Sequence, residues 1–77
     1  MITYKEIYDK VVGSGKYHSR MDKVSAIAQL TFSHKFRGCE TKRDAAWLAL
    51  ELLEDMTGVF YDPTPSEFED VLASIIG

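Results

Sequence analysis

The stretch TKRDAAWLALELLEDMTG, residues 41–58, carries the clearest structural signal in the chain. Its apolar residues recur at intervals of three and four, which is the period of one face of an α-helix. Thr41 followed by Asp44 is typical of a helix start, because both side chains can accept hydrogen bonds from N–H groups that the first turn leaves unpaired. Gly58 is typical of a helix end, since glycine takes a positive φ without steric penalty. The predicted helix buries a stripe made of Ala45, Leu48, Ala49, Leu52, Leu53 and Met56.

Two more helices are predicted on the N-terminal side of this stretch. Thr3 and Glu6 form a capping box for the first helix, and Gly13 is expected to end it with a positive φ. Ser19 begins the second helix, which is expected to run to about Phe36. The apolar face of the first helix comprises Tyr4, Ile7, Tyr8, Val11 and Val12, and that of the second comprises Met21, Val24, Ile27, Ala28, Thr31 and Phe32.

On the C-terminal side, a proline-containing segment separates the 41–58 helix from a last helix. Residues 59–63 cannot be helical near their end, because a residue that precedes proline is pushed to extended geometry. We expect this segment to form a buried aromatic crossover. Thr64 as the cap, Pro65 at the first helical position and Glu67 as the capping-box partner then begin the last helix. Its apolar face comprises Phe68, Val71, Leu72, Ile75 and Ile76.

Together the patterns predict one all-α domain over residues 1–77, a compact four-helix bundle-like fold with short connections. No segment alternates like a strand, and an apolar fraction of 45% suffices for a core. The one cysteine cannot form an internal disulfide and no Cys/His pair has zinc spacing, so we expect no metal and no cofactor. With no long apolar run and no signal-like N-terminus, we expect a cytoplasmic protein without a membrane association.

The charged residues are divided unequally along the chain. All nine Lys and Arg lie within residues 5–43, together with four acids, whereas residues 44–77 contain eight acids and no Lys or Arg. The net charge of −3 is therefore the sum of +5 in the first part and −8 in the second. Either the two parts neutralise each other within the monomer through weak surface pairs, or the acidic part attracts a basic partner.

Trp47, the only tryptophan, falls outside the apolar stripe of its helix and lies between Arg43 and Glu51. Tryptophan is a preferred anchor of protein interfaces, because its rigid ring buries a large area at little entropic cost. In the alternative interpretation, the last helix or the crossover covers the indole. The predicted partner-binding face consists of Trp47, Leu50, Glu51, Glu54 and Asp55.

Three functional hypotheses follow from these features. The first is a small non-enzymatic protein-binding module, a phage-type or regulatory inhibitor that docks on a larger nucleic-acid-handling protein through the acidic face. The second is a nucleic-acid-associated helical protein that uses the basic N-terminal half, although a pI near 5.2 disfavours it. In the third, opposite charges drive homo-oligomers. The anion-binding residues of the second hypothesis are Lys16, His18, Arg20 and Lys23, near a helix start whose N–H groups favour anions.

Two motifs suggest chemistry only superficially. The sequence GSGK at residues 13–16 lacks the first glycine of a phosphate-binding loop and follows a helix rather than a strand. Cys39 with His34 could form a thiol pair, but the pair is expected at a helix end rather than in a cleft. We therefore predict no catalytic residue and no enzymatic activity.

Overall fold

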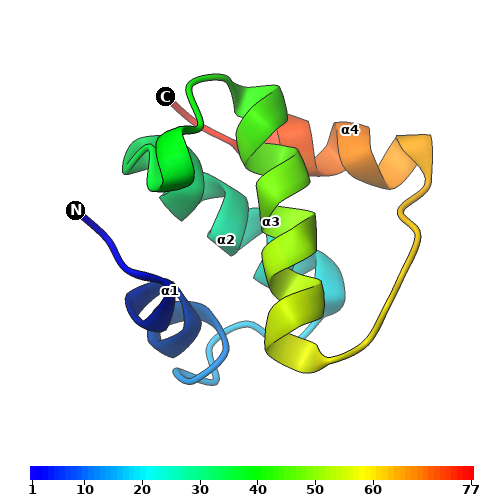
Figure 1. The fold of residues 1–77 in the computed structure, drawn as a ribbon. Helices are drawn as coiled ribbons and strands as arrows, with labels where there is room; N and C mark the ends of the chain where they lie inside the picture. The colour runs from blue at the N-terminus through cyan, green and yellow to red at the C-terminus, as the bar shows by residue number, and fades with distance from the viewer.

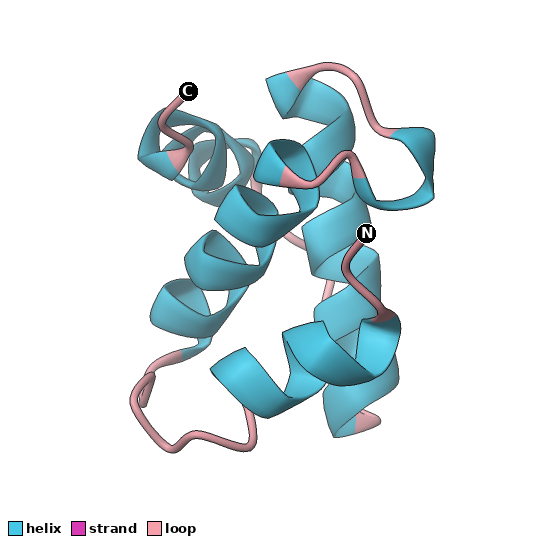
Figure 2. Ribbon diagram, turned by 90° about the vertical axis from the view of Figure 1, so that its left-hand side faces the viewer, coloured by secondary structure: helices cyan, strands magenta, loops and turns pink.

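The computed structural model describes residues 1–77, and every regular element in it is helical (Figure 2). This confirms the predicted all-α class, and the helices form a small bundle-like globule of 27 × 25 × 19 Å. The elements are α1 (Tyr4–Val11), α2 (Arg20–Ser33), the 3₁₀ turn η1 (Phe36–Gly38), α3 (Lys42–Thr57) and α4 (Pro65–Ser74).

Helix α2 is the central element. It packs against α1, η1, α3 and α4, and the α2–α3 contact is the most extensive in the molecule. In Figure 1, α3 crosses in front of α2, α1 lies at the lower left and α4 at the upper right. The outward side of α3 therefore remains free of other helices along most of its length.

The core is a single apolar cluster to which every helix contributes. The buried polar side chain within it, Thr31, is satisfied because its hydroxyl donates to the carbonyl of Ala28 at 2.9 Å. The cluster comprises Ile2, Ile7, Val11, Val24, Ile27, Ala28, Phe36, Cys39, Ala45, Ala46, Ala49, Leu50, Leu52, Leu53, Phe68, Val71 and Ile75.

The predicted helix starts are confirmed at all four positions. The side chains of Thr3, Ser19, Thr41 and Thr64 each accept a hydrogen bond from the backbone N–H three residues later, at 3.0 to 3.2 Å. At α4 the capping box is complete, since the Glu67 carboxylate also accepts from the backbone N–H of Thr64. Local side-chain chemistry therefore fixes where each helix begins.

One predicted helix end is wrong, and another differs only in its backbone geometry. Gly13 directly follows Val12, the C-cap of α1, as predicted, but it does not have the expected positive φ. Helix α2 ends at Ser33 rather than near Phe36, and positive φ angles at Lys35 and Arg37 turn the chain sharply. The reason for this turn is packing, because Phe36 in η1 leaves the α2 axis and enters the core.

Gly58 ends α3 as predicted. It has a φ of 70°, and its N–H donates to the carbonyl of Glu54 at 2.8 Å. A Cβ at this position would meet no other atom within 4 Å, so the cost of a side chain here is conformational only.

The expectation of a buried aromatic crossover at residues 59–63 is wrong. Val59 and Phe60 are exposed, Phe60 to 77%, and Tyr61 is also exposed. Figure 1 shows this segment running along the outside of the molecule, at the right of α3, to reach the start of α4. The connection therefore adds an apolar surface instead of core volume.

Two other residues assigned to apolar faces also lie at the surface. Tyr8 is exposed because α1 buries only the narrow stripe of Ile7 and Val11. Ile76 is exposed because α4 ends at Ser74, and the tail beyond it is held by polar contacts. There the side-chain amide of Gln29 in α2 donates to the Ile76 carbonyl at 2.8 Å and accepts from the Ile76 N–H at 2.6 Å.

We predict that Gly58→Ala lowers the free energy of unfolding by about 1 kcal/mol, because alanine is disfavoured in the left-handed conformation that ends α3. Gly58→Asn is the matched variant. Its free energy of unfolding should fall less, since asparagine tolerates this conformation better than alanine. Urea denaturation followed by circular dichroism measures both. Equal losses in the two variants would contradict the assigned role of the φ angle.

Candidate protein-interaction site

The indole of Trp47 lies on the outer side of α3, half exposed at 52%. Its inner face rests on Phe68 of α4, with ring centroids 4.7 Å apart and planes inclined by 32°. Phe68 is itself buried, and the guanidinium of Arg43 lies 5.1 Å from its ring centroid. This packing fixes one face of the indole and leaves the rest open to solvent, so α4 covers Trp47 only in part.

Leu50 does not belong to this surface, and its assignment to the partner-binding face is wrong. Its side chain is only 3% exposed and is part of the core cluster. The apolar contacts of α3 extend further around the helix than the predicted stripe, because both Ala46 and Leu50 are buried. Trp47 is consequently the one large apolar side chain of α3 that is exposed.

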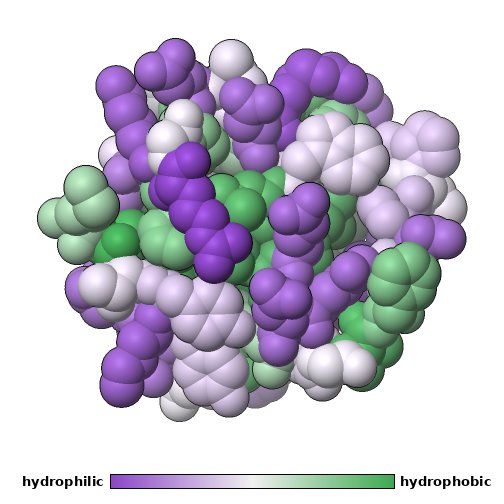
Figure 3. Space-filling view, viewed as in Figure 1, coloured by the Kyte–Doolittle hydropathy of each residue, from purple (hydrophilic) through white to green (hydrophobic).

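The acids around Trp47 project from the same side of α3. Glu51 and Asp55 are exposed, and Glu54 is half-buried at the edge of a groove that Leu53, Thr57 and Val59 also line. Figure 3 looks onto this side and shows hydrophilic side chains on either side of a hydrophobic area in the middle of the molecule, with further hydrophobic side chains at its right edge over the α3–α4 connection. The structure therefore brings together all the predicted face residues except Leu50.

Few of the charges are neutralised within the chain. The structure contains two ion pairs, Lys5 with Asp9 in α1 at 2.8 Å and Arg20 with Glu67 at 3.2 Å. Only the second pair joins the basic part of the sequence to the acidic part. Mutual neutralisation of the two parts thus accounts for one acid of the C-terminal half, and Glu51, Glu54 and Asp55 remain unpaired.

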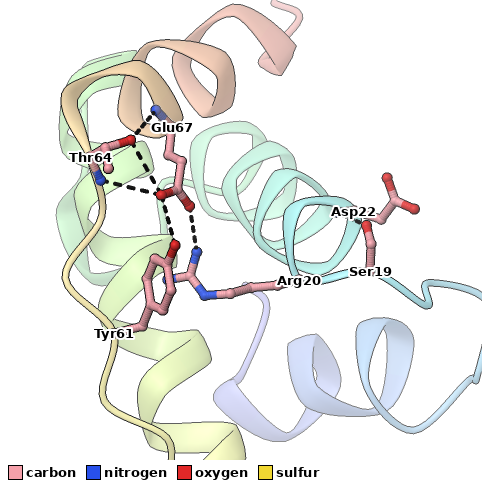
Figure 4. A network of polar contacts seen from close by, with 6 residues as sticks. All are labelled: Ser19, Arg20, Asp22, Tyr61, Thr64 and Glu67. Atoms are coloured by element: carbon pink, nitrogen blue, oxygen red, sulfur yellow. Dashed lines mark hydrogen bonds and ion pairs between the residues drawn. The ribbon is translucent and has the colours of Figure 1, made fainter.

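The Arg20 pair belongs to a clasp, formed by Arg20, Tyr61, Thr64 and Glu67, that ties the α3–α4 connection to α2 (Figure 4). The Arg20 guanidinium lies 3.8 Å from the centroid of the Tyr61 ring, and the Tyr61 hydroxyl donates to Glu67 at 3.0 Å. The same carboxylate accepts from the backbone and the hydroxyl of Thr64. The Nη2 atom of Arg20 is buried and has no hydrogen-bond partner within the chain.

The clasp sets the protonation of its two acidic groups. Burial raises the pKa of Glu67, but hydrogen bonds from Tyr61 and Thr64 and the charge of Arg20 outweigh it, so the pKa lies below its usual value of 4.5. The hydrogen bond to Glu67, and then the charge of that carboxylate, raise the pKa of Tyr61. Glu67 is therefore an ionised structural group and leaves no free carboxylate for a partner.

The proposed anion-binding cluster does not assemble as predicted. Arg20 is engaged in the clasp, and Lys23 faces the groove beside it together with Glu54. Lys16 lies in a different hollow, next to Asp9 and Ser14, and His18 is exposed in the α1–α2 connection. The structure thus separates Lys16 from the Arg20–Lys23 pair and offers no single basic pocket formed by all four residues.

Cys39 and His34 do not form a thiol pair. The Cys39 thiol is 6% exposed and donates to the backbone carbonyl of Thr31 at 2.9 Å, whereas His34 is exposed. Burial raises the pKa of Cys39, and the negative charge of Asp44 raises it further. These are the surroundings of a packed thiol rather than of a nucleophile.

No group of three or more His, Cys, Asp or Glu side chains is placed to hold a metal ion. None of the helices combines the length and the apolar character needed to cross a bilayer.

Two parts of the surface are not evident from the sequence. The exposure of Val59 and Phe60 depends on the path of residues 58–64, and the clasp joins Arg20 to residues more than forty positions away. The only local signal was the pair Pro63 and Pro65, which excludes helix there but does not determine which side chains face solvent.

Comparisons with models of protein families, with curated proteins and with solved structures find no match to this chain. The functional argument therefore rests on the geometry of the site.

We predict that acid destabilises the fold through Glu67. A carboxyl whose pKa is lowered on folding contributes stability at pH values above its unfolded pKa, near 4.5, and this contribution is lost as the pH falls through the folded value. Glu67→Gln should therefore flatten the acid limb of a plot of unfolding free energy against pH. Glu69→Gln, at an exposed acid outside both ion pairs, is the control and should leave that limb unchanged.

We also predict that Cys39 reacts slowly with a disulfide reagent such as dithionitrobenzoate under native conditions. Its burial and raised pKa both reduce the thiolate available for attack. The reaction should accelerate by orders of magnitude in denaturant, when the thiol becomes accessible. A native rate like that of a free thiol would contradict the packed position.

Proposed function

We propose that this chain is a small non-enzymatic protein-binding domain that docks on a basic surface of a larger partner through the outer face of α3. The observation that carries the proposal is a half-exposed, firmly supported indole with Arg43 on one side of it and, further along α3, acids that have no ion-pair partner in the chain. We call this surface, made of Trp47, Glu51, Glu54 and Asp55, the acidic face.

The indole has the properties of an interface anchor. Its contact with Phe68 limits its motion, so a partner that covers it pays little further entropy. A shallow hollow next to it, with Pro63 and Pro65 on its rim, offers a partner side chain further apolar contact. Aromatic anchors of this kind supply much of the affinity of protein interfaces.

The unpaired acids favour a basic partner. Charge complementarity steers encounter and excludes acidic competitors, and its range is about 8 Å at physiological salt. A protein surface that otherwise holds nucleic acid has the required positive charge. If this chain occupies such a surface, it competes with the nucleic acid and acts as a regulatory or phage-type inhibitor.

The experiment is affinity capture from a lysate of the native host, with the wild type, Trp47→Ala and Lys23→Ala compared side by side. We expect the wild type to capture one stoichiometric protein partner. Lys23→Ala should capture it equally well, whereas Trp47→Ala should recover roughly tenfold less of it. Because Trp47 is half exposed, its truncation should leave the fold intact, which circular dichroism checks.

The alternative of nucleic-acid binding predicts the opposite pattern. In a gel-shift assay with DNA and RNA at low salt, complexes that are weakened by Lys23→Ala and unaffected by Trp47→Ala would refute the proposal. A partner captured equally well by the wild type and Trp47→Ala would refute it as well.

A further inference from the structure

The charges of α3 are arranged against its own helix dipole. Lys42 and Arg43 stand in its first turn, where a helix favours negative charge, although Asp44 offsets them in part. Glu54 and Asp55 stand near its C-terminus, where a helix favours positive charge, and its last turn contains no basic residue. Glu54 and Asp55 therefore do not gain stability from the dipole of α3.

Two apolar features lie at the ends of the acidic face. Trp47 lies toward the start of α3, and the exposed Val59 and Phe60 directly follow Gly58 at its end. At a rise of 1.5 Å per residue, the eleven positions from Trp47 to Gly58 correspond to about 16 Å. Glu51 and Asp55 lie between these apolar ends, one helical turn apart.

We propose that the acidic face receives a basic amphipathic helix of the partner, with apolar side chains about three turns apart and Lys or Arg between them. This inference rests on the proposed function and specifies the chemistry of the partner. Lysines or arginines four residues apart on the incoming helix match the spacing of Glu51 and Asp55, and its apolar side chains meet Trp47 at one end and Phe60 at the other.

The uncompensated C-terminal end of α3 also sets the direction of the incoming helix. The N-terminus of a helix carries partial positive charge, which Glu54 and Asp55 attract. The incoming helix therefore runs antiparallel to α3, with its N-terminus beside Asp55 and Phe60.

Neither α1 nor α2 of a second copy supplies such a helix, and the cations of α3, Lys42 and Arg43, are adjacent in its first turn instead of four residues apart. The lysines of α1, Lys5 and Lys10, alternate with acids, and Lys5 is paired with Asp9. In α2, Arg20 is held by the clasp and cannot leave it without releasing Glu67. Charge complementarity therefore favours a different protein as the occupant.

The test uses synthetic helical peptides without tryptophan, so that Trp47 alone reports binding through its fluorescence. The first peptide carries two leucines about eleven residues apart with lysines between them, and the second carries the same residues with the leucines about seven apart. We expect saturable binding of the first peptide, weakened by salt, and affinity roughly tenfold lower for the second. Equal affinities for the two peptides, or no binding of the first, would overturn the proposal.

Charge-reversal variants examine the acidic face itself. Glu51→Lys and Asp55→Lys should each lower the affinity for the first peptide by roughly tenfold. Glu40→Lys, the same change at an exposed acid outside the acidic face, should leave this affinity unchanged. Asp55→Lys should unfold at the same or a higher urea concentration than the wild type, since a cation suits the end of α3. Loss of peptide binding without loss of stability excludes misfolding as the cause. A clear fall in the urea concentration at which Asp55→Lys unfolds would overturn the dipole argument.

The outcomes distinguish this inference from the proposed function. If lysate capture depends on Trp47 but neither peptide binds, the partner uses another element and only the helix proposal is overturned. If capture is also independent of Trp47, the proposed function fails with it. Salt-sensitive dimers of the wild type in sedimentation equilibrium, lost in Asp55→Lys, would identify a second copy as the occupant and overturn the helix proposal.

Discussion

The close crossing of α2 and α3 is the constraint on which the rest of the structure depends. Small side chains make this approach possible, with Ala28 and Thr31 on α2 and Ala45 and Ala49 on α3 all fully buried. The hydroxyl of Thr31 comes within 3.4 Å of the Ala45 carbonyl, which places a side chain of one helix against the backbone of the other. Larger residues at these positions would separate the helices and open the core, because interiors tolerate little change in volume.

This crossing determines which parts of α3 can interact with other proteins. Its inner side is occupied by α2, and α4 packs against the next part of its circumference, where Phe68 lies under Trp47. What remains is the arc with Trp47, Glu51 and Asp55, beside an external connection that a few polar contacts hold in place. The clasp of Arg20, Tyr61, Thr64 and Glu67 ties this connection to α2, and Val59 and Phe60 are exposed on the same connection.

The unequal distribution of charge along the chain contributes little to the stability of the fold and mainly shapes the surface. A domain of 77 residues has a small margin of stability, and acids at the C-terminal end of a helix reduce it. The one ion pair between the two parts of the sequence is placed where it closes the connection, and the acids of α3 have no such role. Under the proposed function, these acids are retained for recognition at some expense in stability, as is common where surface charge serves binding.

The sequence by itself determined the helices and where each begins, because an N-cap is a contact between residues three positions apart. It also determined that Trp47 lies outside the apolar stripe of α3, since helical period fixes the direction of a side chain. Only the tertiary structure decided that Leu50 is buried, that Phe36 turns inward and ends α2, and that Val59 and Phe60 face solvent. Those outcomes depend on which helices meet and at what distance, and on contacts such as Arg20 with Glu67 between residues far apart in the chain, for which local pattern carries no information.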